Sequence, residues 1–207
     1  MSDTRTRCHT FTRQGFDPFN PRAEDVRLED IAHGLAMICR YGGQAPVYYS
    51  VAEHAVKVSR LVGAKTGSVA WALHALHHDS AEAYLGDQRK PLKDLLWFQR
   101  DGELFRFSDL EDLLMADCIF RGLKLPMIGD PTGEQDDVSV SEAMDAAIQA
   151  ADRALLRAEM ESFWGDPNPP GEWHTKIWQR ECLGWEQAEG LFLSEHARLS
   201  AGRLWQA

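Results

Sequence analysis

The chain has 207 residues, of which 32 are acidic and 22 are basic, so its formal net charge at neutral pH is −10. This length is typical of one folded domain, and the charge excludes a protein that binds a nucleic-acid polymer through a broad basic surface. No apolar run approaches the ~20 residues that a membrane-spanning helix needs, and the polar N-terminus does not resemble a secretory signal. The cysteines are scattered and form no paired motif, so we expect a reduced, cytoplasmic protein that does not associate with membranes.

The spacing of apolar residues predicts an all-α protein with a compact bundle of about five or six core helices. Residues 1–27 combine polar residues with glycine and proline, and we expect an irregular N-terminal segment there. From Leu28 the apolar residues recur at intervals of three and four, which predicts a first helix that ends near residues 41–43. Ser50 and Glu53 have the spacing of a capping box, in which each side chain bonds the backbone amide of the other, and they predict the start of the second helix.

Further helices are predicted along the rest of the chain, and no stretch shows the sustained alternation of a β-strand. These helices cover residues 66–85, 92–98, 108–120, 140–163 and 186–199. Clustered prolines break the chain before the last of them. We therefore expect the core domain at residues 28–163, followed at 164–207 by a Pro-rich connection and a C-terminal helix packed on the core.

Polar residues in segments that otherwise look buried are the most informative about chemistry. His78 and Asp79 interrupt the apolar segment that begins at Trp71. A buried aspartate is costly unless it is paired or binds a metal ion. Glu82 follows Asp79 by three residues, which places the two carboxylates on one face of the predicted helix.

Two further residues of this kind lie on other predicted helices. His54 is surrounded by alanine and valine, and Asp152 lies in an alanine-rich stretch of the long helix. Together with His78 and Asp79 they would supply two nitrogen and two oxygen ligands, a set suited to one divalent transition metal ion such as Mn, Co, Ni, Fe or Zn. Four protein ligands leave two positions of an octahedral ion open to water and substrate, as is typical of a catalytic site.

The pattern His54…His78-Asp79…Asp152 resembles the HD-domain family of metal-dependent phosphohydrolases. The flanking segments, which include Tyr49-Ser-Val-Ala-Glu-His-Ala-Val, are similar to the small bacterial and phage 5′-nucleotidases of that family. The resemblance covers about residues 28–163 and implies an HD-domain fold in which these four residues hold the metal ion.

The resemblance also implies roles for residues around the metal ion. Glu82 matches the carboxylate that orients or deprotonates the attacking water, and Asp87 matches a second acid near the leaving oxygen or the sugar. Arg40 matches an arginine that binds the phosphate, for which its planar guanidinium is well suited. Tyr41 matches an aromatic residue near the nucleoside. Gly43-Gln44 departs from the Gly-His of many relatives, which leaves the detail of the substrate-side loop open.

The implied reaction is hydrolysis of the phosphate ester of (deoxy)nucleoside 5′-monophosphates by a metal-activated water. Lys93 and Trp97 are further candidates for contact with this small-molecule nucleotide. One alternative is a (deoxy)nucleoside triphosphate triphosphohydrolase with the same site, which would need more cationic groups and additional Mg for the polyphosphate. Another is a non-catalytic nucleotide-binding protein that keeps the metal for stability, although Glu82 and Arg40 would then have no role. A homodimer is also open, because related HD proteins are often dimers.

Overall fold

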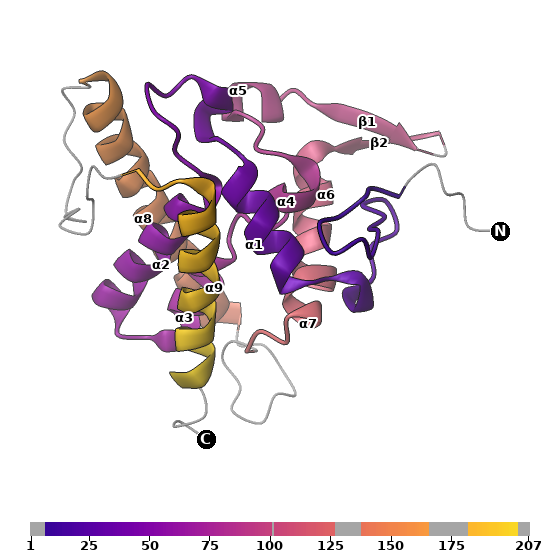
Figure 1. Ribbon diagram of the computed structural model, residues 1–207. Helices are drawn as coiled ribbons and strands as arrows, with labels where there is room; N and C mark the ends of the chain where they lie inside the picture. Colours follow the sequence, from indigo (N-terminus) through magenta and orange to yellow (C-terminus); the bar gives the residue numbers. More distant parts are fainter. Residues whose placement is uncertain (1–6, 101, 127–137, 166–181, 203–207) are drawn as a thin grey trace.

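The structure is a computed structural model that describes residues 7–100, 102–126, 138–165 and 182–202. Helices predominate in this part of the chain, as the sequence predicts, and a two-stranded antiparallel sheet accompanies them. No described helix is long and apolar enough to cross a membrane. Helix α2 (Val51–Thr66) packs against four others (Figure 1): α1 (Leu28–Met37), α3 (Val69–Leu76), α8 (Val138–Trp164) and α9 (Trp185–Gly202).

Helix α2 begins after Ser50, which caps a free backbone amide of its first turn. The side chain of Ser50 accepts a hydrogen bond from the backbone N–H of Glu53 at 3.2 Å, as half of the predicted capping box requires. The other half is wrong, because the carboxylate of Glu53 accepts bonds from Nζ of Lys57 at 2.6 Å and from the backbone N–H of Leu183 at 2.9 Å. Glu53 therefore ties the segment before α9 to α2.

Two clusters of buried apolar side chains form the core, and α2 contributes to both. The larger cluster joins α2 to α1, α3 and α9 through residues that include Leu35, Leu73 and Phe192. The smaller cluster joins α2 to α8 through residues that include Val58, Ile148 and Leu155. Because α2 is shared, this packing fixes the position of α8 relative to the other helices.

The N-terminal segment is irregular, as predicted, and side-chain contacts fasten it to the helices. A backbone bridge pairs Cys8 with Phe16, and Phe16 is fully buried with its ring stacked on Tyr84 at 3.9 Å. The carboxylate of Asp30 on α1 accepts hydrogen bonds from the backbone and the hydroxyl of Thr12 at 2.6 and 2.9 Å. These contacts cover one side of α1.

The helix predicted over residues 66–85 is wrong in its second half. Helix α3 ends at Leu76, and residues 77–81 form a turn before the short helix α4 (Glu82–Leu85). Nδ1 of the buried His77 lies 2.9 Å from the hydroxyl of Ser80, and its ring meets Phe192 of α9 edge-on. These contacts close the turn, so His78 and Asp79 project from a turn instead of a helix face.

The helix predicted over residues 92–98 is also wrong. A single turn, α5 (Lys90–Lys93), is followed by strand β1 (Trp97–Arg100), which pairs with β2 (Glu103–Arg106). The paired rings of Phe98 and Phe105 stack at 5.4 Å, and Phe98 also contacts Phe19 of the N-terminal segment. Cross-strand aromatic pairs of this kind stabilise a hairpin over a helix.

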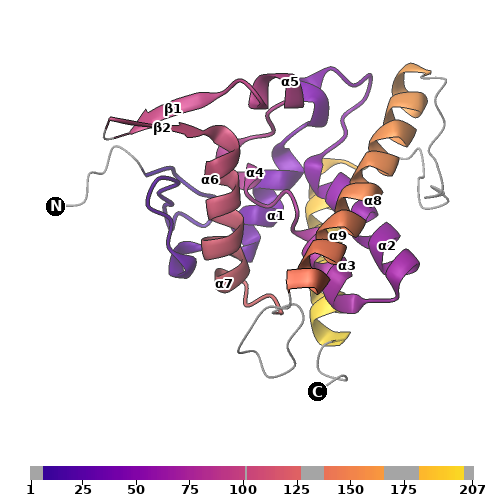
Figure 2. The same cartoon turned by 180° about the vertical axis from the view of Figure 1, so that it is seen from behind.

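The other predicted helices form. Helix α6 (Phe107–Leu113) continues through a π-helical segment, η4 (Leu114–Ile119), into α7 (Phe120–Gly122). Figure 2 shows this run and α8 with α1 and α4 between them. Helices α8 and α9 correspond to the two predicted C-terminal helices. The prolines of the predicted connection lie at 166–181, outside the described residues.

Candidate metal centre

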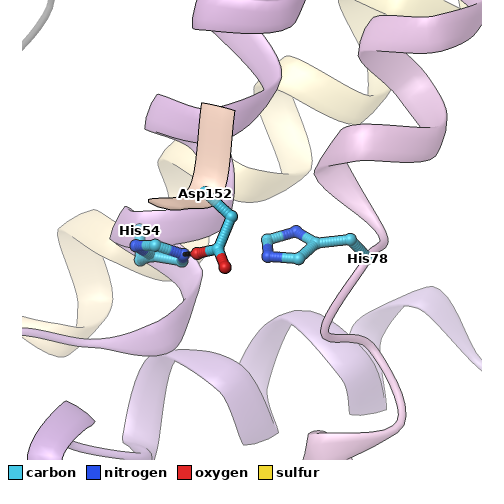
Figure 3. A group of neighbouring side chains, drawn as sticks. All are labelled: His54, His78 and Asp152. Atoms are coloured by element: carbon cyan, nitrogen blue, oxygen red, sulfur yellow. Dashed lines mark hydrogen bonds and ion pairs between the residues drawn. The ribbon is translucent and has the colours of Figure 1, made fainter. Parts of the chain in front are cut away.

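Three side chains from separate segments converge at the centre of the molecule. His54 comes from α2, His78 from the turn after α3, and Asp152 from α8. One potential ligand atom from each lies within 4.8 Å of the others. In Figure 3 the carboxylate of Asp152 lies between the two imidazole rings. This arrangement could hold a metal ion.

The orientation of His54 suits a metal ligand. The residue is fully buried, and its Nδ1 lies 2.7 Å from Oε1 of Glu159. A carboxylate can only accept, so it fixes a proton on Nδ1 and turns Nε2 toward Oδ1 of Asp152 at 3.0 Å, a contact that needs a proton or a cation between the two atoms. Carboxylate–histidine pairs of this kind commonly orient metal-binding imidazoles.

His78 is oriented in the same way by a different acceptor. Its Nδ1 lies 2.8 Å from the backbone carbonyl of Ala75, which fixes the proton there. Its Nε2 is buried and forms an ion-pair contact of 3.1 Å with Oδ2 of Asp79. Both histidines therefore present Nε2 toward carboxylate oxygens at the centre of the site.

Asp79 lies beside the group of three instead of within it. Its Oδ2 contacts His78, and it also lies 3.7 Å from Nη1 of Arg40. The turn after α3 allows this adjacent pair of side chains to point in a common direction, which neighbouring positions on a helix would not. The fourth predicted ligand is thus next to the site, and its role as a ligand stays a prediction.

In the absence of a cation, the surrounding carboxylates draw protons onto the histidines. Burial disfavours the charged form of His78, but Asp79 and Asp152 outweigh this and raise its pKa to about 9. Burial would raise the pKa of Asp79, yet His78 and other positive groups hold it well below its usual range. A metal ion would replace the proton on His78, so its affinity would fall at low pH.

Glu159 is a central residue that the sequence analysis missed. Its side chain is fully buried and accepts hydrogen bonds from the hydroxyls of Tyr41 and Tyr49, while Nε of Arg40 lies 3.5 Å away. Burial opposes its ionisation, but Arg40 and His54 lower its pKa to about 2. One sequence signal could have found it, since it lies seven residues after Asp152 and so on the same face of α8.

Arg40 lies beside two carboxylates that adjoin the metal-binding group, and its role in phosphate binding stays a prediction. Its side chain is mostly buried between Asp79 and Glu159, at 3.7 and 3.5 Å. The backbone that carries it is fixed, because its N–H bonds the carbonyl of Tyr49 at 2.8 Å. Tyr41 follows with a left-handed φ of 61°, and its hydroxyl is directed to Glu159. Its predicted contact with a nucleoside stays a prediction.

A second group of acids adjoins the site on the side of α4. Burial, together with the negative charges of Asp79 and Asp87, raises the pKa of Glu82 to about 10. Burial likewise raises the pKa of Asp87, while Arg40 and Lys93 oppose the shift. Nζ of Lys93 lies 3.9 Å from Oε1 of Glu82 and is held at 2.7 Å by Glu111 on α6, a residue the sequence analysis did not single out.

Trp97 is on β1, where its ring is 53% exposed and lies under the guanidinium of Arg106 at 5.1 Å. No contact between Trp97 and the metal-binding group is among the interactions of the described residues. Of the candidate substrate-binding residues, Arg40 and Lys93 adjoin the buried acids, whereas Trp97 lies on the hairpin. Its role in substrate binding stays a prediction.

Comparison with known proteins identifies relatives but no family model that matches the chain. The chain is 41% identical over 87 residues to the uncharacterized protein YfdR of Escherichia coli, a match that covers 42% of this chain and 46% of YfdR. It is 32% identical over 158 residues to the uncharacterized protein RCAP_rcc00048 of Rhodobacter capsulatus, which covers 74% of this chain and 76% of that protein. The chain therefore belongs to the same family as this Rhodobacter protein.

Proposed function

We propose that the protein is an HD-type phosphohydrolase that hydrolyses the phosphate ester of (deoxy)nucleoside 5′-monophosphates with the help of a divalent metal ion. One observation carries the proposal. Two imidazoles have Nδ1 committed to fixed acceptors and Nε2 directed at carboxylate oxygens, His54 toward Asp152 and His78 toward Asp79, and the guanidinium of Arg40 lies beside Asp79. A site that served only to stabilise the fold would have no need of an adjoining arginine.

The donor set fits a divalent transition metal ion. His54, His78 and Asp152 would hold it, and Asp79 is the neighbouring carboxylate that could complete the set. Nitrogen and carboxylate oxygen together suit Mn, Co, Ni, Fe or Zn. When bound, such an ion supplies Lewis acidity to phosphoryl oxygens and lowers the pKa of a coordinated water.

Arg40 binds the phosphate in this proposal. Its guanidinium has five N–H donors in a planar fork. Its contacts with Asp79 and Glu159 are ion pairs at 3.7 and 3.5 Å, and Nε makes no hydrogen bond to a described residue. N–H donors of Arg40 therefore remain for phosphate oxygens. Its positive charge offsets the negative charge that grows on these oxygens in the transition state.

Glu82 orients the attacking water and accepts its proton. Oε2 of Glu82 is buried and makes no hydrogen bond to another described residue, so this oxygen can take a water as its partner. Burial, with the charges of Asp79 and Asp87, keeps the pKa of Glu82 at about 10, so Glu82 can act as a base only once positive charge has entered the cluster. In this proposal Asp87 acts near the sugar or the leaving oxygen.

The positive charges of this cluster favour a monophosphate over a triphosphate. Arg40 and Lys93 both lower the pKa values of Glu82 and Asp87, so both are close to the region where the phosphate would bind. Two cationic side chains suit one phosphate group, whereas a triphosphate would call for more. Triphosphate hydrolysis is nevertheless the second outcome that the experiment must separate.

The test is a substrate and metal panel with product identification. Metal-stripped protein is incubated with Mn, Co, Ni, Zn or Mg and with nucleoside monophosphates, deoxynucleoside monophosphates and deoxynucleoside triphosphates. We expect inorganic phosphate from the monophosphates, and no product from any substrate in the Asp152→Asn variant. Release of triphosphate would instead support the alternative hydrolase. Tight metal and nucleotide binding without any product would establish a non-catalytic protein.

A further inference from the structure

A cavity of about 450 Å³ adjoins the metal-binding group. It lies between η4 and α8, and His78 and Asp152 are among the residues that line it. This volume is within the range of ordinary small-molecule sites. A substrate held at the metal-binding group could therefore extend directly into this space.

The lining of the cavity is suited to a flat, uncharged group. Met115, Phe120, Met144 and Ile148 supply apolar surface, and sulfur and aromatic groups pack favourably against the face of a planar ring. The lining also includes the carboxylates of Asp112 and Asp145, both on exposed residues. Among the described lining residues none is Lys or Arg, so the cavity would repel a phosphate.

The charged groups that line the cavity therefore differ from those near α4. Arg40 and Lys93 act on the acids near α4, and neither lines the cavity. A nucleotide has the same polarity, with a charged phosphate at one end and a neutral base at the other. We therefore expect the phosphate to lie near Arg40 and Lys93 and the base to lie in the cavity.

Building on the proposed phosphohydrolase function, we propose that this cavity binds the nucleobase and favours bases that present N–H donors, guanine above all. Carboxylates only accept hydrogen bonds, and the adjacent N1–H and exocyclic amino group of guanine match the two oxygens of one carboxylate. Thymine and uracil present mainly carbonyl oxygens toward such a carboxylate and are disfavoured. The apolar lining covers the faces of the base.

The helical run that forms one wall of the cavity has an unusual backbone conformation. η4 (Leu114–Ile119) is π-helical, and it carries two of the lining residues, Met115 and Ala116. π-Helical segments within α-helices occur frequently at functional sites. The distortion of this run coincides with the cavity wall, which is independent support for a ligand site.

The first test fills the cavity. Ala116 is exposed on the cavity wall, and Ala116→Phe would occupy space there, whereas Ala146→Phe places the same group on an exposed position of α8 that does not line the cavity. Kinetics are measured with dGMP and with 2-deoxyribose 5-phosphate, which lacks a base. We expect Ala116→Phe to raise KM for dGMP at least about tenfold, with unchanged kinetics for the sugar phosphate. Ala146→Phe should change neither.

The second test removes the negative charges of Asp112 and Asp145 without filling the cavity. In the double variant Asp112→Asn/Asp145→Asn, we expect the preference for dGMP over dTMP to fall at least about tenfold, the scale of one bidentate contact to a base. A wild-type enzyme with equal kcat/KM for dGMP, dTMP and the sugar phosphate would overturn the proposal. So would an Ala116→Phe variant that leaves the kinetics of dGMP unchanged.

Binding of deoxyguanosine by calorimetry separates this proposal from the proposed function. Binding that is present in the wild type and weakened by Ala116→Phe supports the cavity even if no phosphate ester is hydrolysed. Hydrolysis of nucleotides without any of these base effects supports the phosphohydrolase and overturns the cavity assignment. Circular dichroism of each variant identifies any that fails to fold, and the double Asp variant then supplies the deciding result.

Discussion

Glu159 connects Arg40, the proposed phosphate ligand, to His54, a candidate metal ligand. It accepts hydrogen bonds from Tyr41 and Tyr49 and faces Nδ1 of His54, so its carboxylate orders three side chains from two separate segments. Ionised, it also holds the positive charge of Arg40 in place. A neutral amide of the same size would retain the shape of this arrangement but lose its charge and some of its acceptors.

We therefore expect Glu159→Gln to weaken metal binding by about 10- to 100-fold, the usual effect of removing a group that orients a metal ligand. The measurement is a calorimetric titration of the metal-stripped protein with Mn²⁺. Glu161→Gln is the matched control, because Glu161 is exposed near the same end of α8. Equal affinities for the wild type and Glu159→Gln would show that Glu159 does not orient His54.

Glu82 gives a second prediction for single residues. Because Oε2 is buried without a hydrogen bond from a described residue, we expect Glu82→Gln to leave the bound metal in place and lower kcat by about 10²- to 10⁴-fold, the scale of a general base. Steady-state kinetics and metal analysis of the same sample give the two values. An unchanged kcat would assign the proton transfer to another group.

The elements of the fold differ in how far the sequence predicts them. Helices α2, α8 and α9 follow from apolar spacing, because each has a long buried face. The end of α3 does not follow from the sequence, because the stretch from Trp71 to Leu85 contains neither glycine nor proline. The turn at residues 77–81 is instead closed by contacts of His77 with Ser80 and with Phe192 of the distant α9. The hairpin had a local signal, the Asp-Gly between Arg100 and Glu103, which the helical spacing of residues 92–98 obscured.

The residues of the candidate site likewise differ in how far the sequence predicts them. His54, His78 and Asp152 are recognisable from the sequence because each is a polar residue in an apolar stretch, and the structure brings them together. Glu159 and Glu111 are harder to recognise, because glutamate on a helix is ordinarily a solvated residue. The spacing of Glu159 from Asp152 is a weak signal, and tertiary packing shows that both glutamates face inward. Local pattern thus predicts metal ligands better than the groups that orient the side chains around them.

The packing of α9 provides a prediction for an element. Glu195 on α9 is buried and pairs with Arg198 at 2.6 Å and with Arg60 of α2 at 3.3 Å. Burial would raise the pKa of Glu195, but these arginines outweigh it and lower the pKa. A carboxylate whose pKa is lowered by folding stabilises the folded state above its unfolded pKa, and this contribution is lost as the pH falls through the folded value.

We expect Glu195→Gln to reduce the free energy of unfolding by about 1 kcal/mol at pH 7, a modest value because both arginines are partly exposed. The difference from the wild type should shrink as the pH is lowered below about 4, where the wild-type carboxyl also becomes neutral. Urea denaturation at several pH values measures it. Glu186→Gln, at an exposed position of α9, should stay within about 0.5 kcal/mol. A difference independent of pH would mean that packing, not charge, causes the loss.

For the whole molecule, the surplus of acids that gives a net charge of −10 is partly gathered at one place. Burial, together with the negative charge of Asp79, raises the pKa values of Glu82 and Asp87, and Asp152 adjoins this group of acids, which repel one another when ionised. A divalent cation would relieve this repulsion. It would also join α2, the turn after α3 and α8, which are distant in sequence, so its binding should stabilise the molecule as a whole.

The last prediction follows from this linkage. A ligand at 100 times its dissociation constant stabilises the folded state by about 2.7 kcal/mol, which for a chain of this size corresponds to a rise in Tm of roughly 5–10 °C. We expect saturating Mn²⁺ to give such a rise in scanning calorimetry of the stripped protein and of the Glu161→Gln control, but none in Asp152→Asn, because that variant lacks a carboxylate between the two histidines. An equal rise in Asp152→Asn would place the stabilising cation elsewhere on this acidic chain.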